Sequence, residues 1–204
     1  HMGVYGNETA ESFGITREAQ DAWAARSQQR AIASIESGIF AEEIAPVTIP
    51  QRKGDAIVVD KDEAPRAGTT EETLAKLKPV FGHDGTVTAG NAPGINDGAG
   101  AVVVVSEEEA AARQLDVLAE IVGHAAIAIE PSRFPETPGL IIDTLLKKTG
   151  KQLADIDLFE LNEAFSVVAL AANQIAGLDP EKVNVNGGAV ALGHPIGASG
   201  TRIV

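Results

Sequence analysis

Apolar side chains recur at helical spacing over residues 5–38 and predict a helical start to the chain. Thr16 is placed to act as an N-cap in this stretch, because its hydroxyl can accept a hydrogen bond from a free N–H of the first turn. Trp23 falls on the apolar face and is expected to anchor the core. Gly38 follows the last apolar position, which is typical of a helix end.

The segment that follows is polar and rich in loops. Two short β-type runs, at 47–49 and 56–59, are separated by a basic stretch. A short helix is expected from a cap at Thr69 or Thr70 to Pro79. Because the stretch up to about residue 80 holds few long apolar runs, we expect it to extend from a core and not to form one.

Strand-like and helix-like patterns alternate from residue 118 onward. This order is typical of a layered α/β sheet with right-handed crossovers. We place His124 inside an expected strand, as a hydrogen-bonded structural residue. The expected strands cover residues 101–105, 118–129, 156–161 and 183–185, and the expected helices cover residues 137–150 and 162–177.

Composition and charge narrow the class of protein. The 204 residues are 44% apolar, which is enough for one large or two small cores. A net charge of −13 argues against nucleic acids and anionic membranes as partners. No apolar run is long enough to span a bilayer and no signal peptide is visible, so a cytoplasmic location is expected. The chain has no cysteine, which excludes disulfides, thiolate metal sites and a cysteine nucleophile within these residues.

A glycine-rich stretch, residues 184–200, delivers a single histidine to the start of a helix. Pro195 fits the first helical turn because it lacks an N–H, and the glycines around His194 leave room for a ligand or another backbone. The stretch lacks the Lys-Ser/Thr pair of a phosphate-binding loop and contains no G-x-G-x-x-G dinucleotide fingerprint. A glycine-rich turn with a structural histidine is the simpler alternative to a site.

Asn162 follows the strand expected at 156–161, as His194 follows the next expected strand. Strand ends on one sheet edge lie close together, so the amide and the imidazole are expected to meet. Such a pair can polarise a carbonyl, or the imidazole can take a proton from a nucleophile. A simple N-cap is the alternative role for Asn162.

Three blocks of sequence, taken together, resemble the thiolase family of acetyl-CoA C-acetyltransferases over essentially the whole chain. They are residues 162–165 with 184–200, residues 85–92 with 96–99, and residues 66–70 with 74–81. The resemblance implies a thiolase-like layered α/β fold, present in part, with an inserted α+β loop domain. The implied units are a CoA-binding loop domain (1–80), the end of the N-terminal core half (81–117) and an incomplete C-terminal core half (118–204).

The resemblance also implies site residues and a reaction. His194 would activate a nucleophilic cysteine and line the oxyanion hole, and Asn162 would hold the water that completes this hole. Arg66 and Thr73 would contact the nucleotide end of coenzyme A. The pantetheine tunnel would be lined by Met2, Phe81, Phe134, Ala164 and Phe165. The implied reaction is ping-pong acyl transfer between 3-ketoacyl-CoA, acetyl-CoA and CoA, by a homo-oligomer with CoA as substrate and no metal or redox cofactor.

Two departures from the family pattern matter. Pro93 stands where a serine often contacts the pantetheine arm, which removes one hydrogen bond worth about 1 kcal/mol. Both family cysteines are absent, so we expect a thiolase fragment that is inactive alone. The alternatives are a non-catalytic CoA-binding module, one half of a split thiolase, and a ketoacyl-synthase-like condensing enzyme.

Overall fold

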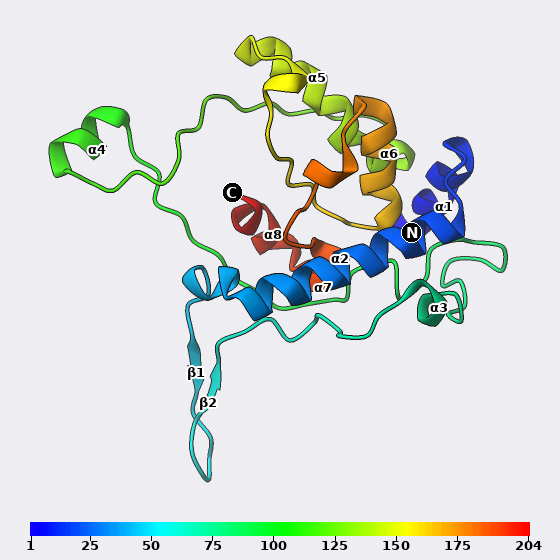
Figure 1. Ribbon diagram of the computed structural model, residues 1–204, viewed down its shortest axis with the longest axis horizontal. Helices are drawn as coiled ribbons and strands as arrows, with labels where there is room; N and C mark the ends of the chain where they lie inside the picture. The colour runs from blue at the N-terminus through cyan, green and yellow to red at the C-terminus, as the bar shows by residue number, and fades with distance from the viewer.

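Helix α2 (Arg17–Ser37) runs across the middle of the molecule (Figure 1). The computed structural model describes residues 1–204. The other α-helices are α1 (Met2–Ser12), α3 (Glu71–Leu74), α4 (Glu107–Arg113), α5 (Thr137–Thr149), α6 (Ser166–Ala176), α7 (Ala189–Leu192) and α8 (Ile196–Ile203). Short 3-10 helices are η1 (Ile39–Glu42), η2 (Pro131–Glu136), η3 (Leu153–Asp155) and η4 (Pro180–Lys182).

The helical stretch predicted over residues 5–38 forms as two helices. Helix α1 ends at Ser12, with Phe13 as its C-cap, and α2 begins after Thr16. The Thr16 hydroxyl accepts a hydrogen bond from the Ala19 N–H at 3.1 Å, which confirms the predicted N-cap. The break between the helices allows α1 to pack against α6 and η2 while α2 packs against α6 and α7.

Helices α5 and α6 confirm the two helices predicted in the second half, although α6 begins at Ser166 and not at residue 162. The expected glycines, Gly150 and Gly177, follow their last turns. The two helices pack closely against each other. A Cβ at Gly139 of α5 would lie 2.9 Å from the Cα of Ala172 on α6, so only glycine permits this contact.

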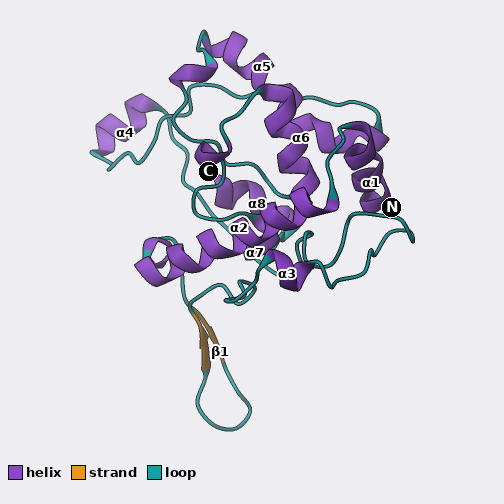
Figure 2. Ribbon diagram, turned by 45° about the vertical axis from the view of Figure 1, so that its right-hand side comes forward, coloured by secondary structure: helices purple, strands orange, loops and turns teal.

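The only sheet is an antiparallel hairpin of β1 (Val47–Ile49) and β2 (Ile57–Val59). Val47 pairs with Val59, and Ile49 pairs with Ile57. The hairpin projects from the body of the molecule as a narrow ribbon (Figure 2). Its strands coincide with the two β-type runs expected in the polar segment, and that segment therefore does extend from the core.

The strands expected at 101–105, 118–129, 156–161 and 183–185 are not formed, and those predictions are wrong. The nearest approach to a strand pair is an isolated parallel bridge between Phe159 and Val183. Val103 and Leu118 are 89% and 96% exposed. A β-type run becomes a strand only where a neighbouring strand exchanges hydrogen bonds with it over several residues. The segments 156–161 and 183–185 pair only at this single bridge, and the segments 101–105 and 118–129 pair with no strand.

The prediction for His124 is also wrong. The residue lies in an unpaired segment and is exposed, and its backbone carbonyl accepts a hydrogen bond from Lys148 Nζ at 2.7 Å. Its ring has no structural hydrogen bond, because the strand that would have buried it is absent.

The core consists of three small apolar clusters that join distant segments. The largest contribution comes from α6, whose Val167 and Ala171 pack with α1 and whose Ala169 packs with Trp23 of α2. Trp23 is 5% exposed, which confirms its predicted role as a core anchor. None of the helices is both long and apolar enough to cross a bilayer.

Candidate functional site

His194 and Asn162 meet, as the sequence predicted. His194 lies on the turn between α7 and α8, and Asn162 lies on the turn that leads into α6. The Nδ2 atom of Asn162 lies 3.3 Å from the Nε2 atom of His194. The N-cap position of α6 is occupied by Phe165, so the alternative role of Asn162 as an N-cap is excluded. Its amide is therefore free to contact the imidazole.

The other ring nitrogen of His194 contacts α8. Nδ1 lies 2.6 Å from the Ser199 hydroxyl, which donates a hydrogen bond to the Pro195 carbonyl at 3.1 Å. Burial lowers the pKa of His194 below its ordinary value. The ring is therefore neutral at pH 7, with one protonated nitrogen and one lone pair that can accept a proton.

The backbone before the histidine is shaped by Gly193, which has a φ of 93°. A Cβ at Gly193 would lie 2.5 Å from the Cγ of Asn96, so the Asn96 amide fills the space beside this turn. Gly98, two residues after Asn96, lies against the ring of Pro195. The small-residue segment around residue 96 thus packs directly on the histidine turn, and close backbone packing accounts for its composition.

The Oδ1 atom of Asn162 is buried and has no hydrogen-bond partner in the protein. Buried amide oxygens normally accept a hydrogen bond from protein or water. An acceptor without a partner beside a neutral imidazole is suited to hold a water molecule at this point.

Glu163 fixes the turn that carries Asn162. Its side chain is 1% exposed and accepts four hydrogen bonds of 2.8 to 3.0 Å. The donors are Trp23 Nε1 and Ser27 Oγ on α2, Asn184 Nδ2 on the loop before α7, and the Val190 N–H on α7. One carboxylate therefore ties the Asn162 turn to α2 and to the segment that leads to the histidine.

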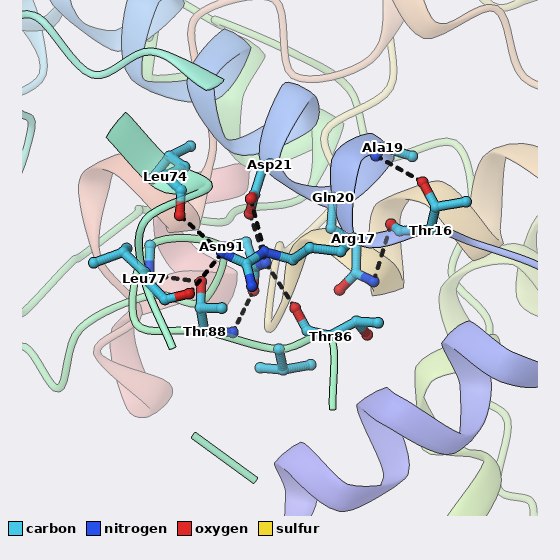
Figure 3. A network of polar contacts seen from close by, with 12 residues as sticks. Thr16, Arg17, Ala19, Gln20, Asp21, Leu74, Leu77, Thr86, Thr88 and Asn91 are labelled. Carbon is cyan, nitrogen blue, oxygen red and sulfur yellow. Dashed lines mark hydrogen bonds and ion pairs between the residues drawn. The ribbon is translucent and has the colours of Figure 1, made fainter. Parts of the chain in front are cut away.

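A second polar network centres on Asn91 (Figure 3). Asn91 is fully buried, and its Nδ2 donates to Asp21 Oδ1 at 2.9 Å. Asp21 in turn receives a hydrogen bond from Arg17 at 2.7 Å. Ser166 is the first residue of α6, and its N–H donates to the Asn91 carbonyl at 2.9 Å. The start of α6 is thereby anchored to α2 through Asn91.

The residues predicted to line a pantetheine tunnel lie near α1, but only two of them form a pair in the structure. The rings of Phe81 and Phe165 meet edge to face, with centroids 6.4 Å apart. Met2 on α1 is 46% exposed, and Phe134 lies on η2, which packs against α1. Ala164 lies in the turn between Asn162 and Phe165, so this group adjoins the histidine site through the chain itself.

Arg66 and Thr73 lie apart from the histidine pair. Arg66 lines a cavity of about 210 Å³ between α2 and residues 66–69. Its backbone N–H donates to Gln28 Oε1 at 2.8 Å, and the Gln28 amide reaches the Val190 carbonyl at 3.4 Å. Thr73 is outside this cavity, and its hydroxyl donates to the Thr70 carbonyl within α3.

Sequence reasoning missed Ser199, Glu163 and Asn91. Ser199 follows His194 by five residues on the adjoining helix, a spacing that could have indicated a contact. Glu163 stands beside Asn162 in a run of apolar residues, which could have indicated a buried acceptor. Asn91 has local partners, since its Oδ1 accepts from the Thr88 N–H at 2.8 Å and its Nδ2 donates to the Thr86 carbonyl at 3.0 Å. Its contacts with α2 and α6 had no signal in the sequence.

Comparison with known proteins places this geometry in a family. Models of the thiolase N-terminal domain and the thiolase C-terminal domain match residues 1–108 and 115–204. Over all 204 residues the chain is 54% identical to an acetyl-CoA acetyltransferase of Thiocystis violacea and 52% identical to one of Pseudomonas aeruginosa. It covers 52% of each of these proteins, so the chain spans about half the length of the curated relatives it matches.

Solved structures give the same result. The acetyl-CoA acetyltransferase of Bacillus anthracis matches all of the chain with a TM-score of 0.97 and 47% identity, over 51% of its own length. Human mitochondrial 3-ketoacyl-CoA thiolase matches 98% of the chain with a TM-score of 0.93 and 45% identity, over 50% of its length. The predicted thiolase-like fold, present in part, is confirmed.

Proposed function

The chain belongs to the thiolase family, and on that premise we propose that it supplies the base and the oxyanion-binding residues of an acyl-CoA acyltransferase. The contact between Asn162 Nδ2 and His194 Nε2 is the observation that carries this proposal. The relatives' names, acetyl-CoA acetyltransferase and 3-ketoacyl-CoA thiolase, give the substrate class: acetyl-CoA and 3-ketoacyl-CoA.

In the proposed reaction His194 Nε2 takes the proton of a cysteine thiol that lies outside these 204 residues. The thiolate attacks the thioester or 3-keto carbonyl, and a tetrahedral intermediate with a negatively charged oxygen forms. A water held by Asn162 Oδ1 donates its other proton to that oxygen and stabilises the charge. Collapse of the intermediate leaves an acyl-cysteine and expels the CoA thiolate or the enolate of acetyl-CoA, which takes up the proton that His194 Nε2 accepted from the thiol.

The lowered pKa of His194 supports the base role, because a neutral imidazole at pH 7 has a lone pair ready to accept the proton. The acyl group then passes to CoA in degradation or to the enolate of acetyl-CoA in synthesis. The proposed enzyme is a cytoplasmic homo-oligomer that uses no metal or redox cofactor. The 204-residue chain alone, which has no cysteine, is expected to be inactive.

A chimera tests this proposal. The matched half of the Pseudomonas aeruginosa relative is replaced by this chain, and acetoacetyl-CoA cleavage is measured. The chimera is expected to be active, and His194→Ala is expected to lower kcat by at least about 10²-fold. His83→Ala is the matched control, because the His83 side chain is fully exposed. A folded chimera in which both variants retain full activity would exclude His194 as the base.

The cavity beside Arg66 favours a second function, binding of coenzyme A without catalysis. Titration calorimetry of this chain with CoA tests it directly. Arg66→Ala is expected to weaken binding about tenfold, because a charged hydrogen-bond donor to the phosphates is lost. Arg52→Ala, which removes an equal charge from the exposed hairpin loop, is the control. Absence of CoA binding by the folded chain contradicts this function.

A further inference from the structure

The Ser199 hydroxyl is the polar group nearest to the imidazole of His194 on the side away from Asn162. It lies 2.6 Å from Nδ1, and Ser199 is 8% exposed. The serine is on α8, five residues after the histidine, so the helix that begins behind His194 folds its hydroxyl back onto the ring. A short contact at a buried position fixes the ring orientation and leaves Nε2 facing Asn162.

The partners of the serine decide which ring nitrogen carries the proton. A hydroxyl has one proton to donate, and a carbonyl can only accept. Because Ser199 donates to the Pro195 carbonyl at 3.1 Å, the lone pairs of its oxygen face Nδ1. The arrangement that keeps both of these hydrogen bonds has the proton on Nδ1, whose N–H donates to Ser199.

The contact at the other nitrogen agrees with this assignment. Asn162 presents Nδ2, a donor, to Nε2 at 3.3 Å. An amide N–H can only form a hydrogen bond with a nitrogen that has a free lone pair. As the two side chains stand, both contacts of the ring fit the same tautomer, with the proton on Nδ1 and the lone pair on Nε2.

We infer that Ser199 is a positioning residue that holds His194 in the Nδ1–H tautomer, so that the lone pair lies on Nε2. In this structure the Asn162 amide donates to that lone pair, and in the reaction the thiol proton replaces this donor. The role in proton transfer rests on the proposed function, whereas the tautomer itself does not. A ring with Nε2–H would point a proton at the thiol and could not act as a base.

Loss of the serine opens the competing tautomer. Without Ser199 the Nδ1–H of the half-buried ring loses its acceptor, which disfavours it. The unpartnered Oδ1 of Asn162 can instead accept from an Nε2–H after rotation of the amide. The serine therefore decides between two arrangements that the asparagine can support equally.

The tautomer is measured by long-range ¹H–¹⁵N NMR of the chain labelled with ¹⁵N-histidine, at a pH where the ring is neutral. His194→Gln identifies the resonances of the ring among the four histidines. The wild-type chain is expected to show a protonated Nδ1 and an unprotonated Nε2. Ser199→Ala is expected to shift the tautomer ratio at least tenfold toward Nε2–H, and Ser199→Thr, which keeps the hydroxyl, is expected to restore the wild-type ratio.

Ser166→Ala is the matched control, because it removes another buried serine hydroxyl that has no hydrogen-bond partner. It is expected to leave the His194 resonances unchanged. A wild-type ring protonated on Nε2, or an unchanged ratio in a folded Ser199→Ala chain, overturns the inference. If the Ser199→Ala chain does not fold, the wild-type spectrum by itself still shows which ring nitrogen of His194 carries the proton.

The activity of the chimera separates this inference from the proposed function. Ser199→Ala in the active chimera is expected to lower kcat about tenfold or more with little change in KM, and Ser199→Thr is expected to recover most of the loss. An inactive chimera with the Nδ1–H tautomer intact contradicts the proposed function and leaves the tautomer assignment standing. An active chimera whose kcat is unaffected by Ser199→Ala overturns the positioning role.

Discussion

The carboxylate of Glu163 is buried without a cation in direct contact with it. Removing such a group from water is costly unless hydrogen bonds replace its hydration. Each oxygen receives two donors, from Trp23 and Asn184 on one side and from Ser27 and Val190 on the other. Four donors that converge on one acceptor explain why a negative charge is tolerated in this core.

Glu163→Gln is therefore expected to lower the free energy of unfolding by about 2–4 kcal/mol, because the new NH₂ group faces two donors and leaves them unsatisfied. Urea denaturation followed by circular dichroism measures the change. The control is Glu181→Gln, whose exposed carboxylate pairs with Arg26 and Arg30, and it is expected to cost less than about 1 kcal/mol. Equal losses in the two variants would contradict the role given to Glu163.

The His194 ring gives a prediction for pH. Its pKa in the folded chain is lowered by burial, so the folded state binds fewer protons than the unfolded state between that value and 6.5. The contribution of His194 to stability is therefore complete above pH 6.5 and declines as the pH falls through this window. An NMR titration of the His194 ring is expected to show a midpoint below 6.5 in the folded chain and a return to the ordinary value in concentrated urea. A folded midpoint at or above 6.5 would show that the ring is not desolvated.

At the scale of elements, the position of α6 sets the position of Asn162, because the turn that carries Asn162 leads directly into this helix. The helix is clamped from three directions: by α5, by the Asn91 network at its first turn, and by the apolar contacts with α1 and α2. Weakening any of these contacts is expected to loosen the start of α6 before it unfolds the helix itself.

The α5–α6 contact is tested at Gly139. Gly139→Ala places a Cβ 2.9 Å from Ala172 Cα and is expected to destabilise the chain by about 1–3 kcal/mol, although alanine favours helix more than glycine. Gly200→Ala on α8 is the matched control. A Cβ there meets no atom within 4 Å, so this change is expected to be neutral or stabilising by up to about 1 kcal/mol. Thermal unfolding of both variants measures the difference, and a stabilised Gly139→Ala chain would disprove the close contact.

At the scale of the whole molecule, the chain combines a strong negative charge with exposed apolar segments. The long excursion that carries α4 (Figure 1) is flanked by β-type runs that remain in solvent, among them Val102 to Val105 and Leu118 to Val122. Contiguous exposed apolar surface is uncommon in a monomeric protein and binds hydrophobic dyes.

We expect the chain to bind anilinonaphthalene sulfonate in its folded state. The double substitution Val103→Lys and Leu118→Lys is expected to lower the dye fluorescence several-fold while the helix content stays unchanged, because both side chains are about nine-tenths exposed. Phe40→Lys, at a buried position, is the contrasting variant and is expected to raise dye binding by unfolding part of the chain. Unchanged fluorescence in the double variant would place the dye site elsewhere.

Local chemistry allowed several features to be predicted from the sequence. Thr16 caps its helix, and Gly38, Gly150 and Gly177 follow the ends of theirs, because these effects depend on residues within one turn. The pairing of Asn162 with His194 could also be predicted, since each follows a β-type run and the blocks around them resemble one family.

The amino-acid sequence by itself thus determined several helix caps, the candidate base and amide, and the family. Only the tertiary structure decided which β-type runs lack a partner, that four donors converge on Glu163, and that Ser199 rather than a distant residue contacts Nδ1 of His194. The physical reason is range: a cap or a turn is satisfied by neighbours in sequence, whereas a strand, a buried carboxylate and an imidazole take their hydrogen bonds from whatever groups the fold brings beside them.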